Sequence, residues 1–547
     1  LHSDLTYEHE PNGSARIVYF LLVIGLLILA IAWVNYSNLT TARSLTRAKE
    51  VGLRKTIGAD RWQLIGQFMG EAFLINMLAV GLALLLMQLS SPLFDELTGR
   101  PLTNSGFTNS LDFFILVVGL LLVSMLGSGL YPSLMLSGHT PIGMLRRVAE
   151  RASSGWGLRR TLVVGQFVGT VVMLVAIITV YRQLQFLQHH DLGLSIDQML
   201  VVKAPLHDFN QDSIYRTRFD VFRAGATQIA GVQHMTTSSV VPGDGINTIG
   251  GSSSGVYWKK RVTSDPQTFY FVNVDEKFID TYGVRRLAGS GFRAIEPQWR
   301  NRFIINRAAL KALGFPSAEA AVNEALVFGT TERAQATDSR IVGVIDDFHI
   351  ESLKLPTRPT LYTCAPPSQM AYYSFRLEAN RIKSSIEQIG QLWKQLYPDS
   401  PFNYFFLDQK FNEQYRAERQ FSQLFGFFTG LAILIACLGL FGLATFTAEQ
   451  RTKEIGVRKV LGASVSSIVT LLSKDFLKLV LIAVVIASPL AWWAMTEWLT
   501  GFAYKIDIEW WVFLLAGTLA MGIALLTVSF QSVKAALMNP VKSLRSE

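Results

Sequence analysis

The chain has 547 residues, of which 50% are hydrophobic and 17% are charged, and its mean hydropathy is +0.29. This composition favours an integral membrane protein over a soluble one. The formal net charge of +9 would suit a nucleic-acid-binding protein. The excess of lysine and arginine, however, lies in short loops between apolar runs, so we expect no nucleic-acid partner. Cys364 and Cys437 are the two cysteines and provide no disulfide framework.

Seven uncharged runs are long enough to be membrane spans, because about 20 apolar residues cross the hydrocarbon core as a helix. None of them contains Asp, Glu, Lys, Arg or His. Ion-coupled carriers usually keep such residues inside their spans, so the absence disfavours a secondary carrier. Glycines four residues apart, at Gly66/Gly70, Gly165/Gly169 and Gly426/Gly430, predict close helix packing. The seven runs are 17–42, 72–94, 113–138, 161–181, 421–448, 479–496 and 510–533.

The loops between these runs alternate in charge. The acidic loops 95–112 and 497–509 are expected outside the cell. The N terminus is predicted to lie outside and the C terminus in the cytosol. Because the span count is odd and the chain starts with Leu1, we expect a truncated start with at least one further span upstream. Basic loops are expected in the cytosol, and four segments are basic: 43–61, 134–160, 450–474 and the tail after residue 533.

Residues 182–420 have the composition of a soluble domain and are predicted to form an exported α+β domain. Helical periodicity marks 306–313 and 382–396. The segment 407–420 places aromatic residues at helical spacing, which predicts a stiff stalk that runs unbroken into the next span. Val, Ile, Phe and Tyr mark four strands, at 199–202, 268–274, 302–306 and 340–345.

One segment of the chain occurs twice. TRAKEVGLRKTIGAD at 46–60 aligns without a gap to QRTKEIGVRKVLGAS at 450–464, at an offset of 404 residues. Each copy leaves one apolar run and leads into another, which indicates a duplicated membrane unit. The spacing of Glu50 and Arg54 places an i,i+4 acid–base pair on one helix face. Gly58 is predicted to end that helix in the left-handed conformation.

The apolar residues of this helix, Val51, Leu53 and Ile57, are expected to be available to a partner or to the bilayer. A membrane-surface helix whose basic residues meet anionic lipid is the simpler interpretation. Lipid contact alone would not require the same order of residues twice, so we favour a protein partner.

These residues carry a family resemblance. The paired segments, the intervening three-helix pattern and the closing NPVKSLR at 539–545, matched by TPIGMLR at 140–146, resemble the FtsX-like permease family of ABC transporters, in its duplicated form. Within the exported domain, 241–243, 306–314 and 342–349 resemble the MacB-type periplasmic core domain. The resemblance implies an α-helical integral membrane protein, here with seven transmembrane helices, and an α+β extracytoplasmic domain of the MacB type.

The resemblance also implies a division into domains. Residues 1–15 would end a first extracytoplasmic domain, and 149–182 would link the units and open the second. The larger parts are a first permease unit at 16–148 with its coupling segment at 43–62, a MacB-like periplasmic domain at 183–420, and a second permease unit at 421–547 with its coupling segment at 449–465.

In this family the repeated segments are coupling helices that contact the ATP-binding subunits. The candidate contact residues are therefore Arg47, Lys49, Glu50, Gly52, Arg54, Lys55 and Gly58 in the first copy, and Arg451, Lys453, Glu454, Gly456, Arg458, Lys459 and Gly462 in the second.

Enzymatic groups are not expected on this chain. No GxxxxGK[ST] sequence occurs, so ATP and Mg would bind a separate ABC ATPase, present in two copies. The GxSxG match at 251–255 is predicted to be a loop. The runs 189–191 and 346–349 contain metal-ligand residue types without the spacing of a zinc site. We expect no catalytic, cofactor or metal site.

The resulting hypothesis is a permease subunit in the bacterial inner membrane. It would transmit ATP-driven motion to the periplasmic domain for export or release of an amphiphile such as a lipoprotein, a peptide or an antibiotic. A membrane-fusion protein or another periplasmic protein is a possible further partner, besides the lipid bilayer. The alternative is a regulatory or signalling protein that controls a periplasmic partner without transport.

Overall fold

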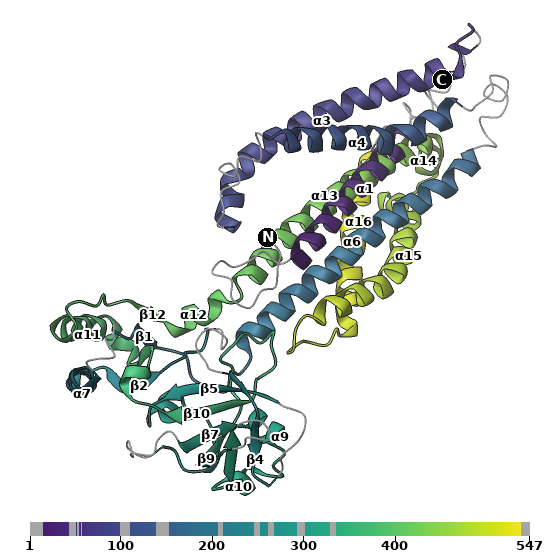
Figure 1. Cartoon of the computed structure of the whole chain (residues 1–547). Coiled ribbons are helices and arrows are strands. Elements are labelled where there is room, and N and C mark those ends of the chain that lie inside the picture. The colour runs from purple at the N-terminus through teal and green to yellow at the C-terminus, as the bar shows by residue number, and fades with distance from the viewer. Residues whose placement is uncertain are drawn as a thin grey trace.

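The computed structural model describes residues 15–42, 51, 54–55, 57–98, 110–137, 152–205, 212–244, 252–260, 267–292, 301–328 and 335–537. A bundle of long helices joins a sheet domain at one end (Figure 1). Seven helices in the described residues have the length and hydropathy of membrane spans, one at each predicted run. They are α1 (Ala15–Ala42), α3 (Arg61–Thr98), α4 (Leu111–Ser137), α6 (Ala152–His189), α13 (Arg416–Gln450), α15 (Val465–Leu499) and α16 (Trp510–Ala536).

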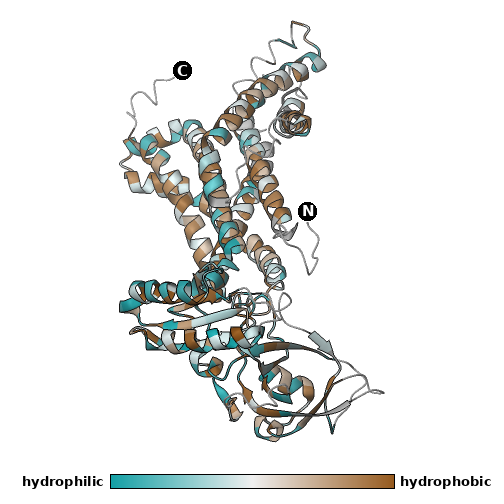
Figure 2. Cartoon of the chain, turned by 60° about the vertical axis from the view of Figure 1, so that its left-hand side comes forward, coloured by the Kyte–Doolittle hydropathy of each residue, from teal (hydrophilic) through white to brown (hydrophobic). Residues whose placement is uncertain are grey.

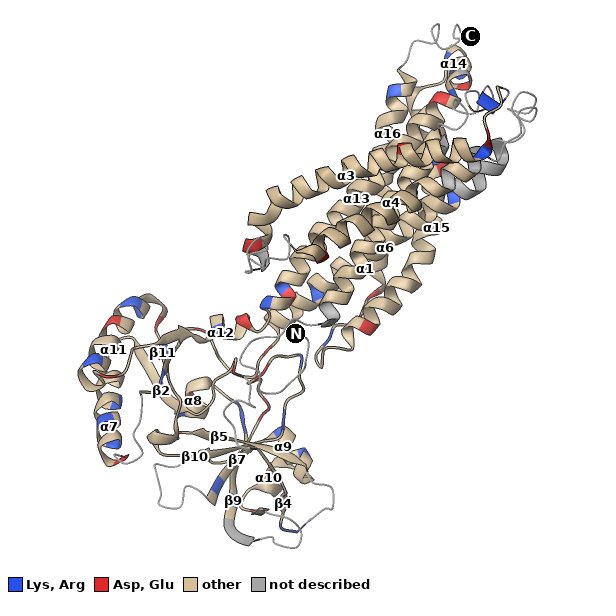
Figure 3. Ribbon diagram, turned by 45° about the horizontal axis from the view of Figure 1, so that its top comes forward, with Lys and Arg blue, Asp and Glu red and all other residues tan. Residues whose placement is uncertain are grey.

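The surface of the bundle is apolar. Hydrophobic residues cover the outward faces of the helices, whereas hydrophilic residues gather on the sheet domain (Figure 2). Charged residues cluster in the sheet domain and at the two ends of the bundle, and the middle of the helices carries almost none (Figure 3). An apolar surface of this extent is stable only against lipid. The prediction of a multi-pass membrane protein is therefore confirmed.

Small residues bring the helices of the second unit together. Ala483, Ala487 and Ala491 of α15 are fully buried and share a core with Ala516 and Ala520 of α16. Both sets recur every fourth residue, so each forms a stripe along one face of its helix. Backbones approach closely across such stripes, as is common between membrane helices.

The first helices of the two repeats, α1 and α13, lie side by side and run in the same direction. The rings of Phe20 and Phe421 are 6.5 Å apart, and further along the Asn35 amide donates to the Ile435 carbonyl at 3.3 Å. That hydrogen bond spans 400 residues, close to the repeat offset of 404, so nearly equivalent positions of the two units meet. Both helices therefore end at the same end of the bundle, which we call the distal end because it is remote from the sheet domain (Figure 1).

The contact between α1 and α13 depends on a glycine. A Cβ atom at Gly439 would lie 2.4 Å from the Asn35 side-chain oxygen, which is closer than real atoms approach. We expect Gly439→Val to destabilise the protein by about 1–3 kcal/mol through overpacking. Thermal unfolding in detergent measures this loss. Gly430→Val on the same helix is the matched control, because nothing lies within 4 Å of its Cβ position. Equal unfolding temperatures for the two variants would contradict the prediction.

The sheet domain is one mixed sheet of 12 strands within the described residues, in the order β12-β1-β11-β2-β5-β10-β7-β9-β8-β4, with β3 on β5 and β6 on β9. All four predicted strands are present, as β1, β5, β7 and the end of β9. The bounds are β1 (Met199–Lys203), β2 (Val232–Ser238), β3 (Ser252–Ser254), β4 (Val256–Trp258), β5 (Thr268–Val274), β6 (Arg286–Gly289), β7 (Arg302–Asn306), β8 (Ala325–Phe328), β9 (Gln335–Ile345), β10 (Thr360–Cys364), β11 (Tyr372–Leu377) and β12 (Tyr404–Phe406).

Helices cover both halves of this sheet. The amphipathic helices α7 and α11 bury Phe222 and Trp393 against Phe375 of β11 in one core. The short helices α9 and α10 bury Leu310 and Ala321 in the core at the other half. The predicted helices at 306–313 and 382–396 are present as α9 and α11, and the α+β class is confirmed. The helix bounds are α7 (Asp212–Gln228), α8 (Phe278–Tyr282), α9 (Arg307–Leu313), α10 (Ala318–Ala321) and α11 (Ile382–Leu396).

The predicted unbroken stalk is wrong. Helix α12 (Leu407–Glu413) ends before α13 begins at Arg416. Between them Tyr415 is fully buried, and its hydroxyl oxygen accepts the backbone N–H of Leu353 at 3.0 Å. A contact from a distant loop therefore interrupts a stretch whose local pattern is helical.

Candidate functional site

The second repeated segment forms a short helix at the distal end. Helix α14 (Thr452–Val460) follows α13 directly. The N–H of Gly462 donates to the Lys459 carbonyl at 3.1 Å, and the N–H of Ala463 donates to the Arg458 carbonyl at 2.9 Å. This pair of bonds is the Schellman ending, and it needs a left-handed residue at Gly462, whose φ is +91°.

The first copy ends in the same way. Gly58 has a φ of +99°, its N–H donates to the Lys55 carbonyl at 3.1 Å, and the N–H of Ala59 donates to the Arg54 carbonyl at 3.0 Å. The prediction for Gly58 is confirmed, and the duplicated sequence adopts a duplicated turn. Four candidate contact residues, Arg47, Lys49, Glu50 and Gly52, lie outside the described residues, and so does the side chain of Lys453.

Two of the apolar positions that the copies share have opposite surroundings. Val51 and Ile455, which are equivalent, are 2% and 5% exposed. Val51 was expected to be available to a partner, and its burial corrects that expectation. Ile57 and Leu461, also equivalent, are 79% and 81% exposed. Each copy therefore presents one large apolar side chain at the tip of its turn.

The charged residues of α14 divide between its two faces. Glu454 and Arg458, the equivalents of Glu50 and Arg54, form an i,i+4 ion pair at 2.9 Å and are partly exposed. The Lys459 ammonium, by contrast, donates to the Ala536 carbonyl at the end of α16. Arg54 and Lys55 of the first copy have helical backbone, and Arg54 donates to the Gln67 side chain of α3.

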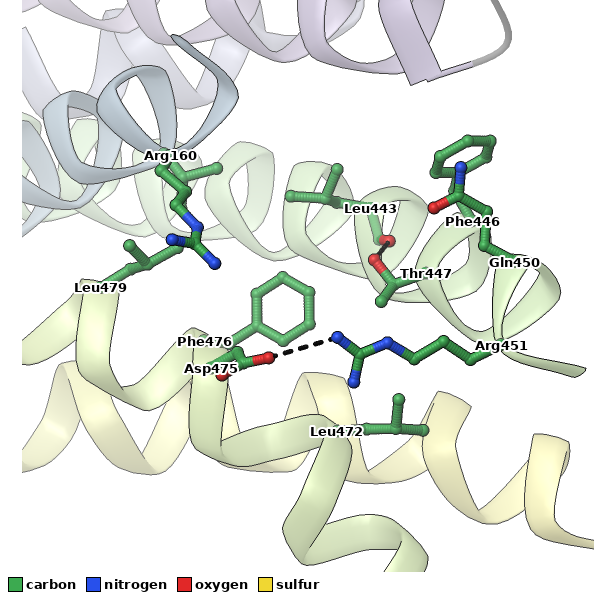
Figure 4. A pocket seen from close by; sticks show the side chains of 11 residues that line it. Arg160, Leu443, Phe446, Thr447, Gln450, Arg451, Leu472, Asp475, Phe476 and Leu479 are labelled. Carbon is green, nitrogen blue, oxygen red and sulfur yellow. Dashed lines mark hydrogen bonds and ion pairs between the residues drawn. The ribbon is translucent and has the colours of Figure 1, made fainter. Parts of the chain in front are cut away.

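Arg451 joins α14 to a neighbouring span. Its guanidinium lies 3.5 Å from the Asp475 carboxylate of α15. The pair lines a small cavity of about 50 Å³ between α13, α15 and α6, to which Arg160 also contributes (Figure 4). The sequence analysis missed Asp475. The repeat offset could have found it, because the same positions of the first copy hold Arg47 and Glu71.

At the opposite end of the bundle, one loop of the sheet domain contacts three spans. Residues 349–357, which we call the junction loop, follow strand β9. The Leu353 carbonyl accepts the N–H of Tyr504 at 3.2 Å, and the Lys354 carbonyl accepts the N–H of Ala503 at 3.0 Å, both from the loop between α15 and α16. Lys354 also forms an ion pair with Glu418 of α13.

Gln183 of α6 completes this junction. Its amide nitrogen donates to the Tyr504 carbonyl at 2.9 Å, and its amide oxygen accepts the N–H of Ile506 at 2.9 Å. The side chain is 0% exposed. Spans α6, α13, α15 and α16 are thus joined at the point where the sheet domain contacts them.

A buried histidine lies within the junction. The His349 ring meets the Tyr504 ring edge-on at 4.7 Å and lies 6.1 Å from His190. Burial, with the nearby charge of His190, lowers the pKa of His349 from 6.5 to about 4, against the opposing effect of Asp191. Within the described residues no group of three or more potential ligands could hold a metal ion.

We expect the junction to weaken in acid. Because the folded-state pKa of His349 lies below its unfolded value of 6.5, its contribution is complete above pH 6.5 and is lost as the pH falls toward 4. The unfolding temperature should therefore fall more steeply between pH 6.5 and 4 in the native chain than in His349→Phe. Parallel pH profiles for the two proteins would contradict this.

The model of the family described as FtsX-like permease C-terminal matches residues 22–141 and again 426–540. No curated protein sequence matches the chain.

Among solved structures, the periplasmic region of MacB from Actinobacillus actinomycetemcomitans has a TM-score of 0.25 and 16% identity, and the match covers 41% of this chain and 94% of that one. The extracellular domain of the noncanonic ABC-type transporter YknZ from Gram-positive bacteria has a TM-score of 0.24 and 11% identity, with 38% and 97% covered. A domain of a putative permease protein from Porphyromonas gingivalis has a TM-score of 0.25 and 14% identity, with 38% and 88% covered.

Proposed function

Because the chain belongs to the FtsX-like permease family, whose model matches both of its repeats, we propose that it is the membrane subunit of an ABC-type complex. In this proposal residues 16–148 and 421–547 are the two permease units. They transmit motion from a separate cytosolic ATPase, which binds ATP and Mg, to the sheet domain outside the membrane. This chain itself binds no cofactor and is not an enzyme.

One observation carries the proposal: the two copies of the repeated segment leave parallel helices at one end and finish in the same turn. Each turn exposes an apolar side chain, Ile57 or Leu461. Two equivalent ATPase subunits would need two equivalent docking points. The pairing of α1 with α13 supports one chain as the source of both.

The route for transmitted motion is α13. This helix has 35 residues, about 50 Å at 1.5 Å per residue. It connects α14 at the distal end to Tyr415 and Glu418, which contact the junction loop. A tilt imposed on α14 would therefore be delivered to the sheet domain.

The basic loops support a cytosolic distal end, with the chain in the bacterial inner membrane, its first described helix starting outside and its C terminus in the cytosol. The cargo class is an amphiphile such as a lipoprotein, peptide or antibiotic, handled with or without a membrane-fusion protein. Control of a periplasmic partner without transport is the second candidate, favoured by the extent of the contact between the junction loop and the spans.

Accessibility labelling tests the orientation. We expect Arg54→Cys and Arg458→Cys to react only when reagent reaches the cytosol, and Lys383→Cys in α11 to react from outside in intact cells. Pull-down of an ABC ATPase from cells that produce this chain tests the assembly. Labelling of Arg54→Cys and Arg458→Cys from opposite sides, or of Lys383→Cys from the cytosol, would contradict the proposal.

A further inference from the structure

A second cavity, of about 220 Å³, opens between the distal ends of α13 and α16, beneath the inner face of α14. Thr452 and Lys459 of α14 line it, with Glu449 of α13 and with Gln531 and Lys534 of α16. We call it the headgroup pocket. The exposed residues Arg458 and Leu461 do not line the pocket, whereas Gly456 and Lys459, which are also candidate contacts for the ATPase, do.

The polar groups of the pocket are not satisfied by one another. Gln531 is 8% exposed, yet its amide oxygen has no hydrogen-bond partner within the described residues. Neither Glu449 nor Lys534 forms an ion pair in that part of the chain, while the Lys459 ammonium already donates to Ala536. A buried acceptor without a donor is rare, because desolvating it carries a cost that a ligand would remove. The pocket thus offers a carboxylate and a carbonyl to a cationic donor, and an ammonium to an anion.

This chemistry is confined to the second unit. Glu449 is matched by Leu45 at the offset of 404. Gln531 and Lys534 are matched by Pro132 and Met135 at the offset of 399 that aligns the closing motifs NPVKSLR and TPIGMLR. A requirement of the duplicated fold would have left polar groups in both copies. The difference points to a ligand that only the second unit binds.

The depth of the pocket identifies the ligand class. Gln531 and Lys534 lie in the last two turns of α16, where a span leaves the hydrocarbon core and enters the headgroup layer. Val533 and Leu537 on the same turns are exposed and can meet acyl chains. The cavity of about 220 Å³ is larger than a single water molecule needs, so it can admit a polar group of a ligand.

We propose that the headgroup pocket binds an aminophospholipid of the ethanolamine type. Lys534 pairs with the phosphate, and Glu449 with the Gln531 carbonyl receives the primary ammonium. A choline headgroup has no N–H to donate, and a glycerol headgroup has no cation, so neither satisfies the carboxylate and the carbonyl together.

The test uses the full chain in detergent, titrated with phosphatidylethanolamine, phosphatidylcholine, phosphatidylglycerol or free phosphoethanolamine and followed by native mass spectrometry. We expect phosphatidylethanolamine to be retained at least tenfold better than the other two lipids. Lys534→Gln and Glu449→Gln should each abolish that preference. Lys478→Gln removes an equal charge from α15, at a residue that does not line the pocket. This variant should keep the preference for phosphatidylethanolamine.

Three results would overturn the proposal. Equal retention of phosphatidylglycerol would show that charge alone is recognised. Equal retention of phosphatidylethanolamine by the Glu449→Gln variant, which keeps Lys534, would show that Glu449 does not receive the ammonium. Displacement of the lipid by equimolar phosphoethanolamine would identify a soluble ester as the ligand.

Discussion

Replacing Ile57 and Leu461 together by aspartate is expected to abolish stimulation of the partner ATPase without unfolding the chain. These side chains are 79% and 81% exposed, so their loss costs the folded state little. A large apolar side chain at the centre of a contact typically contributes 2 kcal/mol or more to binding, about 30-fold in affinity, and a buried carboxylate adds a desolvation penalty. Each single variant should lose one of two sites, and the double variant both.

The measurement is co-purification of the ATPase and its ATP turnover with each variant. Ile214→Asp in α7 is the matched control, because Ile214 is an exposed apolar residue of the sheet domain. The same variants also distinguish docking to the ATPase from contact with the bilayer surface alone. If the turns only rest on the bilayer surface, the double variant would keep full ATPase binding and turnover, and the coupling assignment would be wrong.

The parts of the structure that follow from local chemistry were predictable from the sequence. Uncharged runs of this length predict membrane spans, because a helix of about 20 residues that is apolar on all faces is stable in lipid and not in water. A glycine followed by Ala and an N-capping residue specifies the turn at Gly58 and Gly462, and both turns are present. The strands of the sheet domain have the β-branched and aromatic residues that a pleated sheet packs well.

Features set by contacts between distant segments were not predictable. The break at Tyr415 depends on Leu353, 62 residues earlier, and nothing in the local pattern marks it. Glycine spacing was a partial guide. Nothing in the described part of the chain lies within 4 Å of a Cβ placed at Gly66, Gly70, Gly165 or Gly430, whereas a Cβ at Gly169 would lie 3.2 Å from the Leu27 side chain of α1. Close packing also occurs at Gly439 and along alanine stripes, because the surface that a small residue faces is decided by the whole bundle.

Removal of the Gln183 amide is expected to separate ATP turnover from movement of the sheet domain. Gln183→Leu keeps the volume but leaves the Tyr504 carbonyl and the Ile506 N–H without partners. An unsatisfied buried group costs about 1–3 kcal/mol, so we expect a stability loss of about 2–4 kcal/mol, confined to the loop between α15 and α16. That loop holds Leu353 and Lys354 of the junction loop, so the sheet domain loses the contact with α6 that runs through Gln183, although the chain itself still leads from α6 into β1.

Two readouts distinguish this from general damage. ATPase binding at the distal end should be retained, because α14 is far from the junction. ATP-dependent distance changes between spin labels on α6 and α11 should become smaller, since the bonds of α13 to the junction loop remain. Gln188→Leu is the control: it makes the same chemical change one and a half turns later on α6, at an exposed position. A Gln183→Leu variant that keeps the ATP-dependent distance change would show that motion bypasses α6. The bonds of α13 to the junction loop, through Tyr415 and Glu418, would then be sufficient to carry it.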